Sequence, residues 1–176
     1  ALGAALAGYH LFGKQPRKSG RDAMRGSYLG PHFEQADIEE RLRAAGARFD
    51  VKPDQDLTLT LAQDLAAGKA LGWFQGRMEF GPRALGGRSI IGDPRSPTMQ
   101  KTLNLKVKYR ESFRPFAPSV LRERVADWFE LDGDSPYMLL VANVTEARRR
   151  SMSAEEQQLF GIDKLNVPRS DIPAVT

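Results

Sequence analysis

Helical and strand-like patterns alternate along the middle of the chain, and this alternation limits the possible folds more than any other feature. Residues 34–45 and 56–68 carry apolar side chains at helical spacing. In the second stretch these are Leu57, Leu61 and Leu65, which recur every four residues. Short apolar strands are expected at residues 47–51, 69–74, 89–91, 116–121 and 137–144, and further helices at 97–107 and 122–129. Helices that alternate with strands predict an α/β fold.

The two ends of the chain differ from this middle part. Residues 1–12 are rich in alanine and show helical spacing, whereas residues 13–31 are rich in glycine, proline and charge, which is typical of a linker. A domain boundary is therefore predicted before residue 32. Residues 145–170 are polar and are expected to contain one helix.

Cysteine is absent and histidine is limited to His10 and His32, which excludes disulfide scaffolds, thiolate zinc sites and cysteine nucleophiles. We expect no metal site built within this chain. No apolar run approaches the ~18 residues of a membrane span. Without a signal-peptide pattern or cysteine, the chain is expected to be cytoplasmic and away from membranes.

Positive charge is concentrated in one part of the chain. The whole sequence has 26 Lys plus Arg, 22 Asp plus Glu and a net charge of +4. Residues 76–114 alone hold nine lysines and arginines against three acidic residues, Glu79, Asp93 and Glu111. Such a local excess can create an anion-binding cleft on an otherwise balanced protein.

The first half of this segment, GRMEFGPRALGGRSI, sets arginines between glycines. Glycine lets backbone N–H groups approach an anion closely, and arginine offers paired donors to carboxylate or phosphate. A folded-back loop would aim Arg77, Arg83 and Arg88 at one point. Glu79 would orient an arginine, accept a hydrogen bond from a ribose or amide, or neutralise charge, and Ser89 is a candidate anion ligand.

The second half, KVKYRESFRPF, places Lys106, Lys108 and Arg110 at alternate positions, which all face one side if the chain is extended. Arg114 precedes Pro115, which also favours extended backbone. Such a cluster suits a polyphosphate or an acyl phosphate. A purely structural role for the nine cations is disfavoured, because three acidic residues are too few to pair with them.

Both motifs, with YLGPHF upstream and SDIPAVT at the end, resemble the C-terminal domain of NodU/CmcH-type carbamoyltransferases over about residues 28–176. ALGAALAGYH resembles the last helix of that family's N-terminal actin/hexokinase-like domain. The resemblance implies three parts: the end of that domain (1–12), a linker (13–31) and a YrdC-like domain (32–176), a twisted mixed α/β sheet with flanking helices. It also implies that family chains continue past IPAVT, so this chain is expected to have an incomplete pocket.

The resemblance further implies a reaction. The family uses carbamoyl phosphate and ATP with Mg²⁺ to form carbamoyl adenylate, and the carbamoyl group then passes to a hydroxyl of a natural-product or nodulation-factor acceptor in the N-terminal domain. KYRESFRP is similar to the Lys-x-Arg…Pro motif with which YrdC-like proteins hold phosphates. This match implies catalytic roles for Lys108 and Arg110, to which we add Arg83, with substrate or nucleotide contacts from Arg77, Glu79, Arg88, Ser89, Lys106 and Arg114.

Two further expectations follow. By itself this chain is not expected to complete carbamoyl transfer, because the acceptor domain and its metal-ligating histidines are absent from it. The alternative function is a basic YrdC-like module that binds RNA or nucleotide without catalysis, although a nucleic-acid partner is the less favoured reading. The sequence leaves open whether the chain forms a homodimer.

Overall fold

The computed structural model of the chain describes residues 2–17, 20 and 22–175. A two-stranded antiparallel sheet lies near the centre, formed by β1 (Leu71–Phe74) and β2 (Arg88–Ile91). Leu71 pairs with Ile91 and Phe74 with Arg88, so the two strands form a hairpin around residues 75–87. Both strands confirm the predictions for residues 69–74 and 89–91.

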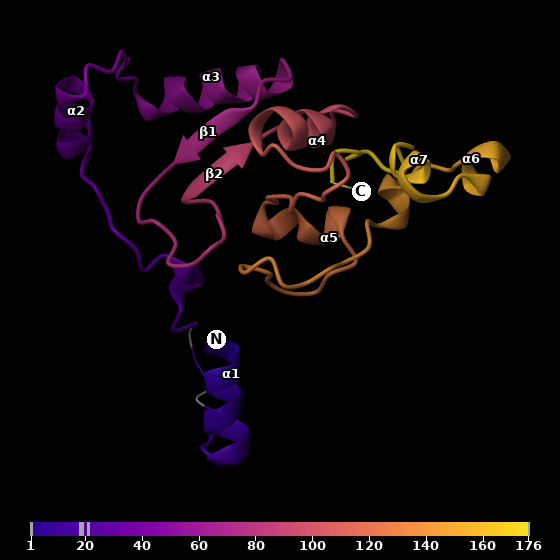
Figure 1. Cartoon of the computed structure of the whole chain (residues 1–176), viewed down its shortest axis with the longest axis horizontal. Helices are drawn as coiled ribbons and strands as arrows, with labels where there is room; N and C mark the ends of the chain where they lie inside the picture. The colour runs from indigo at the N-terminus through magenta and orange to yellow at the C-terminus, as the bar shows by residue number, and fades with distance from the viewer. Residues whose placement is uncertain (1, 18–19, 21, 176) are drawn as a thin grey trace.

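Two helices precede the hairpin, α2 (Gln35–Ala44) and α3 (Asp54–Ala66), and confirm the predicted helices at 34–45 and 56–68. Each has aspartate in its first turn, where the helix dipole favours negative charge. In Figure 1, α3 runs beside the hairpin and α2 lies beyond the far end of α3.

The helix after β2 is built from two parts. The α-helical turn α4 (Met99–Thr102) continues directly into a π-helical turn, η3 (Leu103–Val107), which confirms the helix expected at 97–107. The residue that precedes the first turn of α4 is Thr98. The turn η4 (Arg122–Arg124) and α5 (Val125–Trp128) likewise confirm the helix expected at 122–129.

The terminal regions consist of short helical pieces. At the N-terminal end, α1 (Leu2–Ala7) and the π-helical η1 (Gly8–Phe12) project away from the rest of the molecule (Figure 1). Three turns, η5 (Glu146–Arg148), α6 (Ala154–Gln158) and α7 (Gly161–Leu165), occupy the polar region where one helix was expected. Residues 18, 19 and 21 of the predicted linker lie outside the described residues, and the domain boundary stays a prediction. The linker also contains a short 3₁₀ turn, η2 (Arg25–Ser27).

A small core forms between α4, η3 and the C-terminal segment. Met99, Leu103 and Ala174 are buried together, with Phe116 packed against them. The Ala174 N–H donates to the Pro94 carbonyl at 3.0 Å, which ties the last residues to the loop after β2. The core therefore supports the helix from which residues 104–114 emerge.

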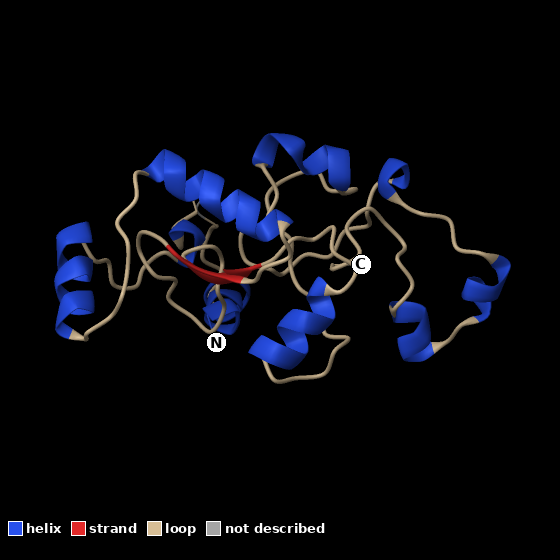
Figure 2. Ribbon diagram, turned by 90° about the horizontal axis from the view of Figure 1, so that it is seen from above, coloured by secondary structure: helices blue, strands red, loops and turns tan. Residues whose placement is uncertain are grey.

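Three expected strands are not formed. Residues 47–51, 116–121 and 137–144 lack strand structure, apart from a single antiparallel bridge between Val144 and Phe129. The structure is thus a mixed helix and strand fold with one small sheet and flanking helices, and a larger twisted YrdC-like sheet is not shown. Figure 2 shows how little of the molecule is strand. Apolar sequence alone cannot make a strand, because each strand needs a hydrogen-bonded neighbour.

Among the described helices, none has the length and hydropathy required to cross a membrane.

Candidate functional site

The loop between β1 and β2 is organised around the buried carboxylate of Glu79. Glu79 is 4% exposed, although it lies in a glycine-rich loop. Its Oε1 accepts hydrogen bonds from the backbone N–H groups of Leu85 (2.5 Å) and Gly87 (2.8 Å). Its Oε2 accepts from Nε of Arg88 at 3.2 Å. The carboxylate therefore ties the two ends of the loop together.

These contacts keep Glu79 ionised. Burial is the strongest influence and by itself would raise the pKa of the carboxyl. Hydrogen bonds from the N–H groups of Leu85, Glu79 itself and Gly87, with the charge of Arg88, outweigh burial and lower the pKa below its ordinary value of 4.5. The Glu79–Arg88 pair is therefore charged on both sides at neutral pH.

Arg88 and Ser89 direct their polar atoms into the same loop. Nη2 of Arg88 donates to the carbonyls of Glu79 (3.4 Å), Gly81 and Arg83 (3.4 Å). Oγ of Ser89 accepts from the Gly86 N–H at 3.0 Å. Both residues thus shape the loop, and in this state much of their hydrogen-bonding capacity is used there.

The remaining two loop arginines differ from each other. Nη1 of Arg77 donates to the Gly30 carbonyl at 2.6 Å, so Arg77 fastens the loop to the preceding segment. Arg83 is exposed, and no side-chain hydrogen bond or ion pair is found for it among the described residues. Of the three, Arg83 is the one whose guanidinium has no hydrogen-bond partner among the described residues.

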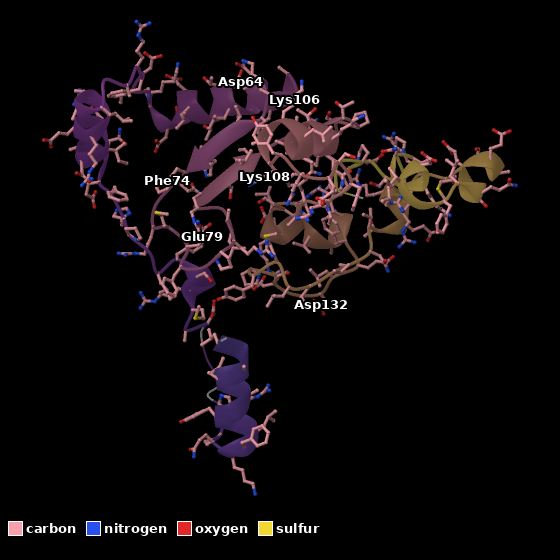
Figure 3. All side chains as sticks on the ribbon, in the orientation of Figure 1. Asp64, Phe74, Glu79, Lys106, Lys108 and Asp132 are labelled. Atoms are coloured by element: carbon pink, nitrogen blue, oxygen red, sulfur yellow. The ribbon has the colours of Figure 1, made fainter. Side chains whose placement is uncertain are left out.

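The lysines that follow are not in extended chain, so the condition under which Lys106, Lys108 and Arg110 would face one side is not met. Lys106 lies in η3 and Lys108 caps its C-terminal end, with helical backbone at Lys108. Successive helical residues are rotated around an axis rather than alternating between two sides, so the two lysines point in different directions. Both side chains are exposed. Figure 3 shows them nearer the helix after β2, apart from the loop that carries Glu79.

Arg110 follows a sharp reversal of the chain. Tyr109 has φ of 49°, a left-handed conformation that is costly for a bulky residue. The reversal lets the Arg110 N–H donate to the Asn104 carbonyl at 3.0 Å and Nε of Arg110 donate to Oδ1 of Asn104 at 2.6 Å. The guanidinium also lies over the Phe116 ring, 4.9 Å from its centroid. We call residues 104–114 the basic turn.

Asn104 is the residue at this site that the sequence did not indicate. It is fully buried, at 0% exposed, and its Nδ2 donates to the carbonyls of Ser112 (3.0 Å) and Arg114 (2.9 Å). A polar residue six positions before Arg110 gives no recognisable spacing. The one indication in the sequence is that Asn104 follows Leu103 in a predicted helix, on the side expected to face the core.

The balance of acids and cations predicted for residues 76–114 is confirmed. Each of its three acidic residues pairs with an arginine of the same segment: Glu79 with Arg88, Asp93 with Arg95 and Glu111 with Arg114. For the other six cations, no acidic partner is found in the part of the chain that the structure describes: Arg77, Arg83, Lys101, Lys106, Lys108 and Arg110. The segment therefore keeps positive charge that the described acidic residues do not neutralise.

The predicted site residues fall into two groups. The hairpin loop carries Arg77, Glu79, Arg83, Arg88 and Ser89, and the basic turn carries Lys106, Lys108, Arg110 and Arg114. Within the described residues, no hydrogen bond or ion pair joins one group to the other. A single composite site is thus not assembled by direct contacts in this structure.

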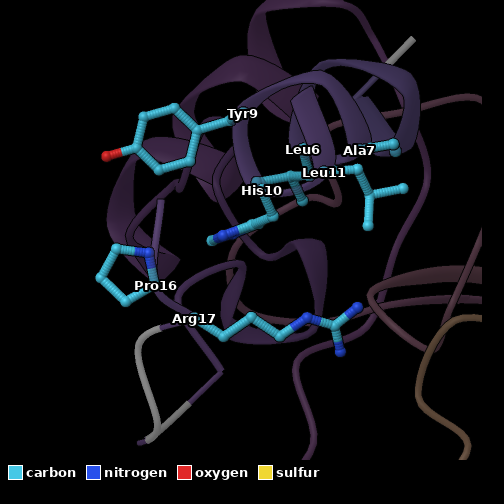
Figure 4. Close-up of a pocket in the computed structure, with 8 residues that line it drawn as sticks. Leu6, Ala7, Tyr9, His10, Leu11, Pro16 and Arg17 are labelled. Atoms are coloured by element: carbon cyan, nitrogen blue, oxygen red, sulfur yellow. The ribbon is translucent and has the colours of Figure 1, made fainter. Parts of the chain in front are cut away.

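Two cavities lie close to apolar side chains. One cavity, of about 310 Å³, is lined by Ile91, Met99, Leu103 and Phe116 among others. It therefore lies beside the small core that supports the helix before the basic turn. Another of about 670 Å³ lies between η1 and the chain returning at Pro16 and Arg17 (Figure 4) and contains no predicted site residue. Across the described residues, no group of three or more His, Cys, Asp or Glu side chains is placed to hold a metal ion.

The fold and site define a domain of mixed helix and strand in which several arginines and lysines of the hairpin loop and the basic turn have no acidic partner among the described residues. Comparison with known proteins then gives its family. Residues 62–176 match the family described as Carbamoyltransferase C-terminus. The chain belongs to this family of transferase domains, which confirms the resemblance.

Several relatives share this region. The chain is 59% identical to an uncharacterized protein of Synechocystis sp. over its full length, which is 29% of that protein. It is 40% identical to nodulation protein NolNO of Sinorhizobium fredii over 88% of this chain and 23% of the relative. It is 41% identical to 3'-hydroxymethylcephem-O-carbamoyltransferase of Streptomyces clavuligerus over 57% of this chain and 19% of that enzyme. The chain thus spans about a quarter of the length of these relatives.

Proposed function

We propose that this chain is the carbamoyl-adenylate-forming part of an O-carbamoyltransferase and binds carbamoyl phosphate and ATP. The observation that carries the proposal is the set of six cations for which the described residues offer no acidic partner, in a domain of the carbamoyltransferase family. Anionic substrates are the chemical complement of such a set, because arginine and lysine bind phosphate and carboxylate oxygens through charge-assisted hydrogen bonds.

We assign a role to each site residue according to whether its charged group is already paired with an acidic residue. Arg110, Lys108 and Arg83 contact the reacting phosphoryl and carbamate oxygens, since their charged ends are not used by acidic residues of the described chain. Lys106 and Arg77 add positive potential around them, whereas the charge of Arg114 is already paired with Glu111. Glu79, Arg88 and Ser89 keep the loop in shape and present its backbone N–H groups.

The chemistry asks for positioning and charge stabilisation. In the proposed sequence water first attacks the phosphorus of carbamoyl phosphate, the bond from that phosphorus to the carbamoyl oxygen breaks, and inorganic phosphate and carbamate result. A carbamate oxygen then forms a bond to the α-phosphorus of ATP, and the bond from that phosphorus to the bridging oxygen breaks as pyrophosphate leaves. Negative charge grows on phosphoryl oxygens, and fixed cations lower the barrier without a covalent nucleophile. Mg²⁺ would enter with ATP, which it binds through phosphate oxygens.

The longer relatives support a second domain as partner. We propose that the carbamoyl group passes to a hydroxyl acceptor bound by an N-terminal actin/hexokinase-like domain of the same protein. The exposed apolar side chains of α1 and η1, such as Leu11 at 69% and Phe12 at 87%, are surfaces that such a domain would cover. The name of the Streptomyces relative states O-carbamoyl transfer for that enzyme.

We extend the proposal to the sheet. Residues 139–141 are apolar and exposed, with Val141 at 100%, and the bridge from Val144 to Phe129 begins an antiparallel pair next to them. A strand from elsewhere in the longer protein would continue this pairing into a YrdC-like sheet. A homodimer and a cytoplasmic location stay predictions.

Calorimetry with carbamoyl phosphate, and separately with ATP and Mg²⁺, tests the function. We expect binding that weakens by about 1.5–3 kcal/mol in Lys108→Ala and in Arg110→Ala, the usual cost of one charged contact. Lys52→Ala and Arg48→Ala remove exposed cations outside both groups and are matched controls that should bind as the original chain does.

Equal affinities in all four variants would refute the site. Tight binding to duplex RNA with no response to ATP or carbamoyl phosphate would instead favour the alternative, a basic binding module without catalysis. Strong weakening of that RNA binding by salt would be its further signature.

A further inference from the structure

Arg88 and Arg110 are both held through Nε, but one acceptor is charged and the other is not. Nε of Arg88 donates to the carboxylate of Glu79, which neutralises the guanidinium. Nε of Arg110 donates to the amide oxygen of Asn104, which carries no charge. The same atom is held in both cases, but only the charge of Arg88 is compensated by its acceptor.

We propose that Asn104 is a positioning residue that holds Arg110 in place without neutralising it, so that the guanidinium is presented to an oxyanion. The inference rests on the proposed function, because it concerns the arginine assigned there to substrate contact. Asn104 itself is buried and touches no ligand in this assignment.

The surroundings of Asn104 leave its amide one orientation. Its two N–H donors face the carbonyls of Ser112 and Arg114, at 3.0 and 2.9 Å. Carbonyl oxygens accept hydrogen bonds and cannot donate them, so the NH₂ end must lie there and Oδ1 must face Arg110. The orientation of the amide is thus set by backbone groups that do not titrate.

The second contact of Arg110 also preserves charge. The face of the Phe116 ring attracts the guanidinium through its quadrupole and does not neutralise it. Phe116 in turn packs against the core cluster of Met99, Leu103 and Ala174, so the ring is itself supported. Arg110 is therefore held on one edge and one face by two uncharged groups.

The geometry leaves the ligand-binding end of Arg110 available. Its side-chain hydrogen bond uses Nε, and none from Nη1 or Nη2 is found among the described residues. The two terminal nitrogens of a guanidinium form a fork that fits two oxygens of a phosphate or carboxylate. A fixed fork also loses less rotamer freedom when it binds.

Gln100 supplies a matched control. It lies four residues before Asn104 on the same helix, and its Nε2 donates to the carbonyls of Phe113 (3.4 Å) and Arg114 (3.2 Å). It thus supports the same part of the chain as Asn104 with an amide, but it does not contact Arg110. Any loss of binding that comes only from loosening the basic turn should appear in Gln100→Ala as well.

The test compares Asn104→Ala, Asn104→Asp and Gln100→Ala by calorimetry with carbamoyl phosphate and by NMR of the arginine Nε–H signals. We expect Asn104→Ala to weaken binding at least tenfold, with loss of the slowly exchanging Arg110 Nε–H signal. Asn104→Asp should keep that signal, because one carboxylate oxygen still accepts from Nε. It should also weaken binding at least tenfold, because the carboxylate compensates the arginine charge and the two donors to the Ser112 and Arg114 carbonyls are lost. Gln100→Ala should change binding less than threefold.

Three results would overturn the inference. These are unchanged affinity in Asn104→Asp, equal losses in Gln100→Ala and Asn104→Ala, or an Arg110 signal that is the same with and without Asn104. If Asn104→Asp does not fold, the comparison of the two alanine variants decides. Absence of any binding by the original chain would refute the proposed function, and the NMR signals would then decide separately whether Asn104 fixes Arg110.

Discussion

Removing the Glu79 carboxylate should destabilise the chain far more than removing an exposed carboxylate of the same segment. The Glu79 side chain is 0% exposed and accepts from two backbone N–H groups and from Arg88, whose side chain is 31% exposed. In Glu79→Ala, all three donors lose their acceptor and the arginine charge loses its partner.

The magnitude follows from the environment of the pair. Removal of one member of a buried ion pair costs about 3–5 kcal/mol, and the partial exposure of Arg88 places this case near the lower end, at about 3 kcal/mol. The hydrogen bonds to Leu85 and Gly87 belong to the same network, so their contributions are not added separately. Because whole domains have about 5–15 kcal/mol of stability, this loss is large but need not unfold the chain.

Urea unfolding followed by circular dichroism measures the effect. With a typical dependence of about 1–3 kcal/mol per molar urea, a 3 kcal/mol loss lowers the midpoint by roughly 1–3 M. The control is Glu111→Ala, since Glu111 pairs with Arg114 at 2.8 Å but both side chains are 53% exposed, which limits the expected loss to about 0–1 kcal/mol. Similar losses in the two variants would refute the reasoning that burial makes Glu79 the organiser of the loop.

Three further perturbations address the same regions. The pKa of Glu79 in the folded chain lies below its ordinary value of 4.5, so the ionised carboxylate contributes its full stabilisation above pH 4.5. The difference in unfolding free energy between the original chain and Glu79→Gln should therefore shrink as the pH falls through the lowered pKa. A difference that stays constant from pH 7 to pH 3 would contradict this. Gly87→Ala should cost about 1–3 kcal/mol of unfolding free energy, since its Cβ would lie 2.9 Å from the Arg77 carbonyl oxygen, whereas Gly72→Ala meets nothing within 4 Å and is the control. Leu103→Ala should cost about 2–5 kcal/mol by opening the core, and Leu105→Ala, at a position 46% exposed, should cost less than about 1 kcal/mol in the same unfolding assay.

Local patterns predicted the elements whose stabilising contacts are close in sequence. The apolar spacing of α3 and the short apolar runs of β1 and β2 are sufficient, because helix bonds are internal and the two strands are neighbours in one hairpin. Residues 137–144 show the limit. Their sequence is as strand-like as that of β1, but a strand depends on a partner that the sequence of the segment cannot specify.

For the site as well, the correct predictions are those that depend on contacts close in sequence. Counting acids against cations predicted unneutralised charge near Arg110, and this holds because ion pairs form mostly within the segment. A shared direction of Lys106, Lys108 and Arg110 depended on extended chain, which is not formed there, since the helix predicted for 97–107 includes Lys106 and the backbone at Lys108 is also helical. Asn104 escaped prediction because its role depends on the reversal at Tyr109, which no local propensity favours.

The hairpin loop is also bonded to the segment that the sequence indicates as a linker. The Gly30 N–H donates to the Met78 carbonyl at 2.9 Å, and the Met78 N–H donates to the Pro31 carbonyl at 3.0 Å. The Tyr28 hydroxyl donates to the Leu85 carbonyl at 2.7 Å, on the other side of the loop. Residues 28–31 therefore pack against the loop that Glu79 closes. Because the Leu85 N–H donates to Glu79 while the Leu85 carbonyl accepts from Tyr28, the linker segment and the Glu79 carboxylate hold the same residue of the loop.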